Sequence, residues 1–182
     1  MTKIKTLLQL SAEERMSALS AVEEIFFLST SIKSFSSIEK KSAFYKKWCK
    51  DYQAYYPELF FIVFEDQKVL GYLSGCLDSA KSLEVLVVPG QSVFQDLFND
   101  FPAHLHINFH PDARGKGMGS LLVKHYIDFL RFNSIPGVHL VTSPDAPNVS
   151  FYDRLGFTHT HIREINGSPL LFMGKILDEN RQ

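Results

Sequence analysis

Two stretches near the start of the chain repeat apolar residues with a helical period. Residues 11–28 carry an apolar residue at nearly every third or fourth position, and Ser11 precedes Glu14 at the spacing of a capping box. A second face, rich in aromatic residues, begins at Ile38 and continues until Pro57 interrupts it. The pattern therefore predicts two amphipathic helices in the first third of the chain.

The period then shortens to that of strands. Residues 59–65 and 69–77 are short apolar runs on either side of the polar segment 65–68, which predicts two antiparallel strands joined by a hairpin turn. Residues 83–88 fit either another strand or an extended loop, and residues 92–98 fit a short helix.

The second half of the chain alternates strand and helix patterns. The predicted elements are a strand at 103–109, a helix at 117–132, a strand at 138–141, a helix at 148–155, and strands at 158–165 and 170–176 around an Asn-Gly turn. A strand, helix, strand succession implies two parallel neighbours with a right-handed crossover. We therefore expect a single α/β domain over residues 1–182, with a central, mixed and mostly antiparallel sheet of six or seven strands and helices on both faces.

Composition excludes several classes of function. With 182 residues, 45% of them hydrophobic, the chain can bury one substantial core, and a net charge of -1 gives no broad positive field for nucleic acid. Cys49 and Cys76 have no partners at zinc-site spacing, which favours a reducing setting and no metal. The sequence shows neither a signal peptide nor an apolar run near the roughly 20 residues that span a bilayer. We expect a cytoplasmic protein that binds neither nucleic acid nor membrane.

The most informative segment follows the strand at 103–109 and opens the next predicted helix. It consists of Arg114, Gly115, Lys116, Gly117, Met118, Gly119 and Ser120. Free amides at a helix start, the helix dipole and glycines without a Cβ atom all favour a bound phosphate, and the two basic side chains add charge. The glycine spacing matches neither the nucleotide-triphosphate loop nor the dinucleotide fingerprint. The segment is predicted to bind an anion, with a tight turn and solvated charges as the alternative.

Two motifs together resemble a known family. Arg-x-x-Gly-x-Gly, from Arg114 through Gly119, resembles the coenzyme A signature of the GNAT superfamily of acetyltransferases, and the strand end His110-Pro111 looks similar too. Residues 148–157 resemble the family's later motif, in which an asparagine starts a short helix and Phe-Tyr-x-x-Leu-Gly-Phe follows. On these motifs, which cover about residues 104–157, the chain is identified as a GNAT-like N-acetyltransferase.

The resemblance implies a cofactor site as well as a fold. Acetyl-CoA would be the co-substrate, with its diphosphate on residues 114–120 and its pantetheine arm beside Asn148. The strands at 103–109 and 138–141 would splay apart, so that the arm lies along Ile107, Asn108 and Phe109 like an added strand. The backbone N–H of Phe109 or its neighbour would stabilise the oxyanion. An asparagine at position 148 also fits a helix N-cap.

Direct attack by an amine on the thioester needs a proton donor and a proton acceptor. Tyr152 is the candidate donor, because a tyrosine pKa of about 10 lies near a thiol pKa of about 8.5; a half-buried aromatic is the alternative. His104, His106 and Asn108 share one strand face, and histidine titrates near neutrality. We therefore take His106 first and His104 second as the proton relay, against solvated or core histidines.

A second resemblance bears on Asn108. Residues 103–108 also look like the acetyltransferase-like domain found with O-GlcNAc hydrolases, whose members commonly carry aspartate at the position of Asn108. Asparagine cannot accept a proton, which puts an acid–base role there in doubt. A catalytically silent acyl-CoA-binding or sensor module is therefore the rival to the enzyme.

The acceptor stays open at this level. A small-molecule amine and a protein amine fit equally well, and sheet edges near the C-terminus could pair two copies into a homodimer. The aromatic stripe of the second helix, which comprises Tyr45, Trp48, Tyr52 and Tyr55, could line an entrance or belong to the core.

Overall fold

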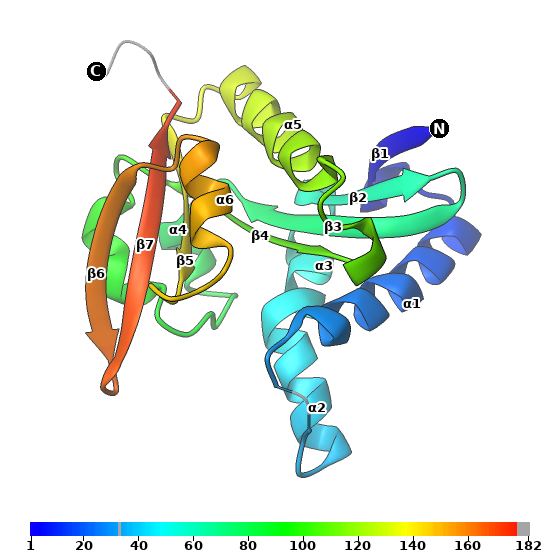
Figure 1. Ribbon diagram of the computed structural model, residues 1–182, viewed down its shortest axis with the longest axis horizontal. Helices are drawn as coiled ribbons and strands as arrows, with labels where there is room; N and C mark the ends of the chain where they lie inside the picture. The colour runs from blue at the N-terminus through cyan, green and yellow to red at the C-terminus, as the bar shows by residue number, and fades with distance from the viewer. Residues whose placement is uncertain (33, 178–182) are drawn as a thin grey trace. The chain divides into compact units, whose positions relative to one another are not determined.

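The computed structural model describes residues 1–32 and 34–177 of the protein. In this part of the chain seven strands form one sheet of order β1-β2-β3-β4-β5-β7-β6 (Figure 1). The strands are β1 (Thr2–Thr6), β2 (Phe60–Glu65), β3 (Lys68–Cys76), β4 (Ala103–Phe109), β5 (Gly137–Thr142), β6 (His159–Ile165) and β7 (Ser168–Ile176). The β4–β5 pair is parallel, whereas β1–β2, β2–β3, β5–β7 and β6–β7 are antiparallel. The predicted mixed sheet is confirmed.

The helices connect these strands in the expected order. They are α1 (Ala12–Ser29), α2 (Ile38–Tyr45), the π-helical segment η2 (Lys46–Lys50), α3 (Asp51–Tyr55), α4 (Ser79–Ser82), α5 (Met118–Phe132) and α6 (Val149–Arg154), together with the 3-10 turns η1 (Leu7–Gln9), η3 (Pro57–Leu59), η4 (Ser92–Leu97) and η5 (Pro111–Ala113).

Helix α1 begins where its capping box predicts. The Ser11 hydroxyl accepts a hydrogen bond from the Glu14 amide at 3.2 Å, and the Glu14 carboxylate accepts one from the Ser11 amide at 2.8 Å. Both orphan amides are thereby satisfied, which stabilises the first turn. The apolar face of the helix then buries Val22 and Ile25.

The second predicted helix is present but changes its winding midway. The amide of Asp51 donates to the carbonyl of Lys46, five residues back, so one π-helical turn separates α2 from α3. Tyr45 and Tyr52 are buried, which assigns these two members of the aromatic stripe to the core, whereas Tyr55 is 51% exposed.

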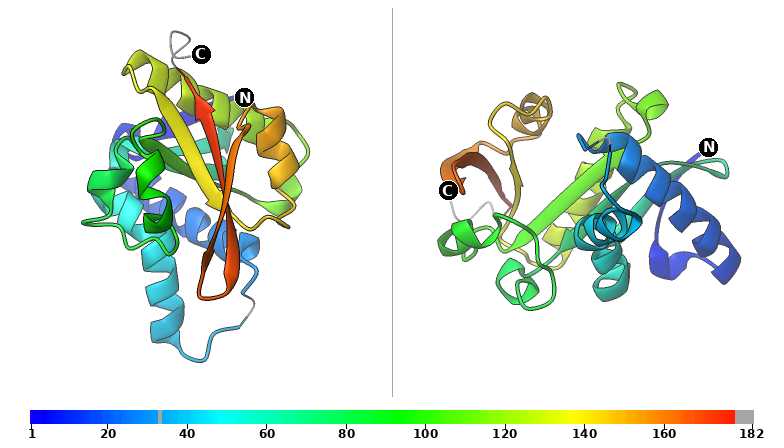
Figure 2. Two further views of the ribbon diagram at one scale, coloured as in Figure 1. Left: turned by 90° about the vertical axis from the view of Figure 1, so that its left-hand side faces the viewer. Right: turned by 90° about the horizontal axis from the view of Figure 1, so that it is seen from below.

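The chain forms two compact units, which we describe separately. The first comprises residues 1–75 and 106–124. It contains β1, β2, β3, the second half of β4 and the first turns of α5, and α1 lies on the opposite face of these strands from those first turns (Figures 1 and 2). Its core includes the fully buried side chains of Phe60, Ile62 and Tyr72.

The second unit comprises residues 76–105 and the described residues from 125 onward. Here β7 lies between β5 and β6, and the β6–β7 hairpin is plain in Figure 2. Segment η4 and the chain after it bring Phe94, Phe98 and Phe101 against Phe172 of β7, and these four rings form one core cluster of this unit. The hairpin turn uses positive φ angles of 50° at Asn166 and 75° at Gly167, as its Asn-Gly sequence predicts.

Two differences from the predicted elements have simple causes. Strand β1 was not predicted, because Ile4 is its one strongly apolar residue; it forms by pairing with β2, where Ile4 lies opposite Val63. Residues 83–88 take the loop alternative and follow the short helix α4. The expected helix at 92–98 is the 3-10 segment η4.

Candidate active site

The turn between β4 and α5 adopts a conformation that only glycine accommodates well. Gly115 has a φ of +74° and Gly117 a φ of +77°, both in the left-handed region. A Cβ atom at either position would meet nothing within 4 Å, so the space beside the turn is open. The carbonyl of Gly117 accepts the first helical bond from the amide of Leu121 at 3.0 Å, which places the turn directly at the start of α5.

The amides of this turn are available to a ligand. Among the described residues, none accepts a hydrogen bond from the backbone nitrogens of residues 115–120. A helix start leaves four amides without intrahelical partners, and the helix dipole gives that end a partial positive charge. The 15-residue helix α5 therefore presents a row of donors to any anion in the open space.

Arg114 is held beside this turn by the end of β4. Its Nε donates to the Phe109 carbonyl at 3.2 Å and its Nη2 donates to the Ser29 hydroxyl of α1 at 3.2 Å. The Ser29 hydroxyl donates in turn to the Phe109 carbonyl at 3.4 Å. These bonds fix the guanidinium while the Nη1 group keeps its donors, and the exposed side chain of Lys116 adds a second positive charge.

His106 of β4 lies against the second helix. Its Nε2 is 3.0 Å from the hydroxyl of Tyr52, and the rings of Trp48 and Tyr52 meet the imidazole edge-on at 5.8 and 5.4 Å. The side chain keeps some exposed surface, yet burial lowers the pKa of His106 to about 4. The imidazole is therefore neutral at physiological pH.

Asn108, two residues along the strand, meets a different tyrosine. Its Nδ2 donates to the hydroxyl of Tyr72 on β3 at 2.9 Å. The Tyr72 hydroxyl also bonds the thiol of Cys49, and burial raises the pKa of Tyr72 well above its usual value and that of Cys49 to about 12. The sequence pattern singled out Tyr52 but not Tyr72, and it indicated the β4 partner of neither, because a tyrosine inside an apolar pattern carries no mark of its partner.

His104 occupies a different setting in the second unit. The side chain is 2% exposed, and its Nδ1 lies 2.8 Å from Ser79 Oγ and 2.7 Å from Gln91 Nε2. Its backbone carbonyl accepts a hydrogen bond from the Tyr126 hydroxyl at 3.2 Å. These contacts are those of a histidine satisfied in a core.

Tyr152 is also buried in the second unit, at 3% exposure, with Phe151 and Phe157 packed edge-on against its ring. Burial raises the pKa of Tyr152 above its ordinary value. Tyr152 therefore keeps its proton at physiological pH and is a weaker acid than a free tyrosine, because a phenolate would lose its solvation here.

Asn148 stands at the N-cap position of α6, but its side chain does not cap the helix. Its Oδ1 instead accepts a hydrogen bond from the Thr142 hydroxyl at 3.3 Å. The predicted side-chain cap is wrong, because the backbone of Asn148 is already helical, with φ −86° and ψ −7°, rather than in the extended form that a capping side chain uses.

The structure thus divides the predicted site residues between the two units. The first unit holds His106, Ile107, Asn108, Phe109 and residues 114–120, and the second holds His104, Asn148 and Tyr152. The parallel ladder of β4 and β5 consists of the pairs Ala103–Val138 and His104–His139, all in the second unit.

Comparison with known families agrees with the turn and its helix. The model of the acetyltransferase (GNAT) family matches residues 21–157. The chain belongs to the acetyltransferase (GNAT) family. Acetyl transfer from acetyl-CoA is general in this family, so the protein is an acetyltransferase by membership.

Solved structures share the GNAT fold over nearly the whole chain. A protein named SsHAT is 21% identical, with a TM-score of 0.71, over 98% of this chain and 99% of that one. The ribosomal-protein-S18-alanine N-acetyltransferase from Escherichia coli is 19% identical, with a TM-score of 0.56, over 99% and 98%. A putative acetyltransferase from Salmonella typhimurium, solved with its cofactor acetyl-CoA, is 20% identical, with a TM-score of 0.56, over 98% and 95%.

The turn at residues 114–120, which we call the GNAT turn, fits the diphosphate of acetyl-CoA. A diphosphate requires hydrogen-bond donors, room close to the backbone and positive charge. The turn offers amides that have no acceptor among the described residues, two glycines without Cβ atoms and two basic side chains. Within residues 1–32 and 34–177, no cluster of three or more His, Cys, Asp or Glu side chains could hold a metal ion. Over the same residues, no helix is long and apolar enough to cross a membrane.

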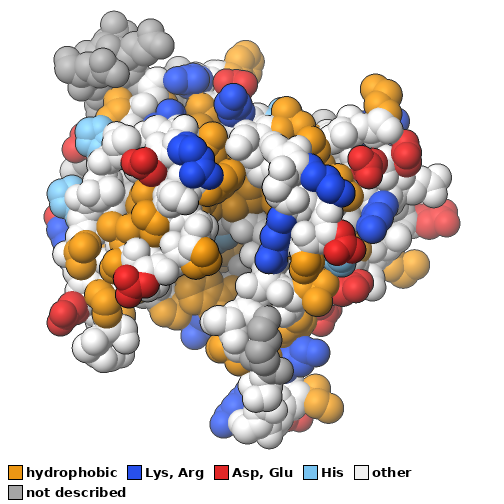
Figure 3. All heavy atoms as spheres, in the orientation of Figure 1, with side chains coloured by type: hydrophobic (Ala, Val, Ile, Leu, Met, Phe, Trp, Pro, Cys, Tyr) orange, Lys and Arg blue, Asp and Glu red, His pale blue; other side chains and the backbone are white. Residues whose placement is uncertain are grey.

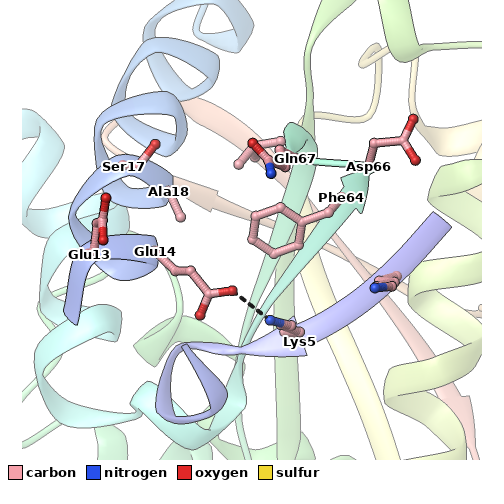
Figure 4. A pocket seen from close by; sticks show the side chains of 10 residues that line it. Lys5, Glu13, Glu14, Ser17, Ala18, Phe64, Asp66 and Gln67 are labelled. Atoms are coloured by element: carbon pink, nitrogen blue, oxygen red, sulfur yellow. Dashed lines mark hydrogen bonds and ion pairs between the residues drawn. The ribbon is translucent and has the colours of Figure 1, made fainter. Parts of the chain in front are cut away.

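Other surface features do not belong to this GNAT site. A cavity of about 480 Å³ lies in the first unit, lined by α1 and the β1–β3 strands, and Figure 4 shows Lys5 paired with Glu14 beside the Phe64 ring. On the face drawn in Figure 3, Lys and Arg side chains are dispersed among Asp and Glu side chains instead of forming a stripe.

Proposed function

We propose that the protein is an acetyl-CoA-dependent N-acetyltransferase that transfers an acetyl group to an amine by direct attack in a ternary complex. The observation that carries the proposal is the row of amides at residues 115–120, which have no acceptor among the described residues. Membership of the acetyltransferase family names the ligand that such a row would hold.

The binding roles follow from these groups. The amides of residues 115–120 would bind the diphosphate, with Arg114 and Lys116 balancing its charge. The backbone of Ile107, Asn108 and Phe109 would pair with the pantetheine arm, and Asn148 would contact the same arm. Acetyl-CoA would supply a thioester whose acetyl group forms a bond to the amine nitrogen as the carbon–sulfur bond breaks.

The chain's own groups would move two protons. Tyr152 would donate its hydroxyl proton to the departing sulfur, and the amide of Phe109 or its neighbour would stabilise the oxyanion. The proton of the amine would leave through water past His106. Because the pKa of His106 is about 4, this imidazole relays protons and is too weak to hold one at neutral pH. His104 stays the second candidate for that relay.

The acceptor is an amine of a small molecule or a protein. The Escherichia coli neighbour is named for an alanine of ribosomal protein S18, which supports protein amines as candidates. The resemblance of residues 103–108 to the domain found with O-GlcNAc hydrolases stays a prediction, as does a homodimer. Neither Cys49 nor Cys76 forms a disulfide bond, and both are buried, which supports the predicted cytoplasmic setting.

A silent acyl-CoA-binding module is the second candidate function. Asn108 and the low pKa of His106 favour it, because neither side chain can hold a proton at neutral pH. The two functions share the GNAT turn and differ only in whether the thioester is consumed.

Two measurements on the wild-type protein test these functions. Calorimetry with CoA should show binding with 1:1 stoichiometry, and free-thiol release from acetyl-CoA should increase with at least one amine of a panel of phenethylamine, tryptamine, glucosamine, lysine and an Ala-initiated peptide. Binding without thiol release would select the silent module. The absence of CoA binding would overturn both functions.

A further inference from the structure

Asn108 has one side of its amide bound and the other side open. Its Nδ2 donates to Tyr72, whereas its Oδ1 accepts no hydrogen bond from any described residue. The side chain is half-buried, and its Oδ1 is not one of the buried polar atoms that lack a partner, so water or a ligand can reach this oxygen and supply a donor.

Tyr72 is itself anchored from the other side. Its ring is fully buried and stacks on Phe60 at 5.2 Å, and its hydroxyl bonds the thiol of Cys49. A thiol is a weak hydrogen-bond donor and an amide N–H is a strong one. The three side chains therefore bond best when Asn108 donates to the Tyr72 hydroxyl and Tyr72 donates its proton to the sulfur of Cys49. The amide of Asn108 therefore has one preferred orientation.

The same network continues into the second helix. Gln53 Nε2 donates to the Tyr45 hydroxyl at 3.0 Å and lies 3.4 Å from the Cys49 sulfur. Cys49 is thus held by groups from α2, α3 and β3, which makes it a rigid support for Tyr72. An aspartate at position 108 would place a carboxylate oxygen against Tyr72 and require the Tyr72 proton to turn away from sulfur. The network therefore suits asparagine.

We propose that the side-chain carbonyl of Asn108 receives an N–H of the acceptor amine, and that Tyr72 is the positioning residue that turns this carbonyl toward the amine. This inference rests on the proposed acetyltransferase function. A neutral carbonyl orients an amine without stabilising its ammonium form, as a carboxylate would, so the amine enters in the form that can attack.

The test compares two tyrosines of one network. Tyr72→Phe removes the hydroxyl that touches Asn108, and Tyr45→Phe removes a buried hydroxyl that does not touch it. With the amine of the panel that gives the fastest thiol release, Tyr72→Phe should raise the KM for the amine about fivefold and leave the KM for acetyl-CoA unchanged, as expected for one misoriented neutral hydrogen bond. Tyr45→Phe, which alters the network without removing the contact to Asn108, should raise the amine KM less than Tyr72→Phe does and leave the KM for acetyl-CoA unchanged.

Two further readouts separate positioning from general damage. In an Asn108→Ala background, Tyr72→Phe should have no added effect on the amine KM, because there is no amide left to orient. By NMR of the free protein, the Asn108 side-chain amide protons should exchange with water faster in Tyr72→Phe than in the wild type or in Tyr45→Phe.

Each outcome decides the matter. Thiol release that proceeds with an unchanged amine KM in Tyr72→Phe, or with additive effects in the double variant, overturns this inference and leaves the proposed function standing. If no amine releases thiol from acetyl-CoA in the wild type, the proposed function fails and takes this inference with it.

Discussion

The predicted site residues of the first unit differ from those of the second in what their polar groups bind. In the first unit, the backbone amides of residues 115–120 have no acceptor among the described residues, and the side-chain carbonyl of Asn108 has no donor among them. In the second, His104 is bound by Ser79 and Gln91, and Asn148 by Thr142. A motif residue whose polar group has no partner in the fold can bind a ligand with it, whereas a polar group that is hydrogen-bonded within the fold stabilises the fold. Changes at the open groups of the first unit should therefore alter binding, and changes at the hydrogen-bonded groups of the second should alter stability.

Tyr152→Phe is the change most able to break this comparison. If the hydroxyl gives its proton to the departing sulfur, kcat should fall about 100-fold, the usual lower range for a lost general acid. Tyr126→Phe is the matched control, because it also removes a buried hydroxyl of the second unit, one that bonds the carbonyls of Cys76 and His104. Steady-state kinetics would measure kcat for both variants. A Tyr152→Phe protein that keeps full kcat at every pH would show that this tyrosine is a core residue and not the proton donor.

Gly117→Val should weaken CoA binding about 100-fold, through the loss of two or so charge-assisted bonds when a side chain covers the amides. Gly167→Val controls for backbone strain, since Gly167 has a φ of +75° against +77° for Gly117 and equally open surroundings. Calorimetry with CoA would compare the two variants. Equal losses in both would show that strain, and not blocked amides, causes the effect.

His106 should make stability depend on pH. Its pKa is about 4 in the folded protein against 6.5 for a free histidine, so between these values the unfolded chain binds more protons. The free energy of unfolding should therefore rise by about 2 kcal/mol from pH 4 to pH 7, allowing for the partial exposure of the ring. Urea unfolding at a series of pH values would measure this rise, which should be smaller in His106→Gln; an identical rise in that variant would contradict the assignment.

His104→Leu should lower the free energy of unfolding by about 1.5 kcal/mol, because the buried amide of Gln91 loses its partner. Thermal unfolding would show the loss. We expect this loss of stability without a large change in kcat. A kcat that falls more than tenfold in a folded variant would indicate that His104 takes part in the reaction.

Asn148→Ala should have the smallest effect. No helix cap is lost, so stability should change by less than about 0.5 kcal/mol. If Asn148 contacts the pantetheine arm, the Kd for CoA should rise about threefold. Calorimetry would detect this rise. An unchanged Kd would show that Asn148 does not contact the pantetheine arm.

Local signals in the sequence were enough to predict much of the fold. The capping box of α1, the Asn-Gly turn of the last hairpin and the glycine spacing before α5 act over a few residues, and each appears where predicted. Strand β1 could not be predicted in this way, because its stability comes from β2, some 60 positions along the chain.

Local sequence also indicates part of the candidate site. The turn at residues 114–120 is marked by its glycines, because Gly115 and Gly117 take positive φ angles that glycine adopts at the least cost. The partners of the β4 side chains do not, since Tyr52 and Tyr72 reach that strand only through tertiary packing. The shifted pKa values of His106 and Tyr152 have the same origin, because burial is the cause of both.

The π-helical turn at Lys46–Lys50 determines the direction in which the following side chains, those of Asp51–Tyr55, point from the helix axis. Rewinding this turn as a regular α-helix, with every residue kept, would rotate Asp51–Tyr55 by about 100° about the helix axis. Tyr52 would then leave His106, while Tyr45, upstream of the turn, would keep its place. The spacing of this helix, and not only its composition, thus carries information about the chemistry of β4.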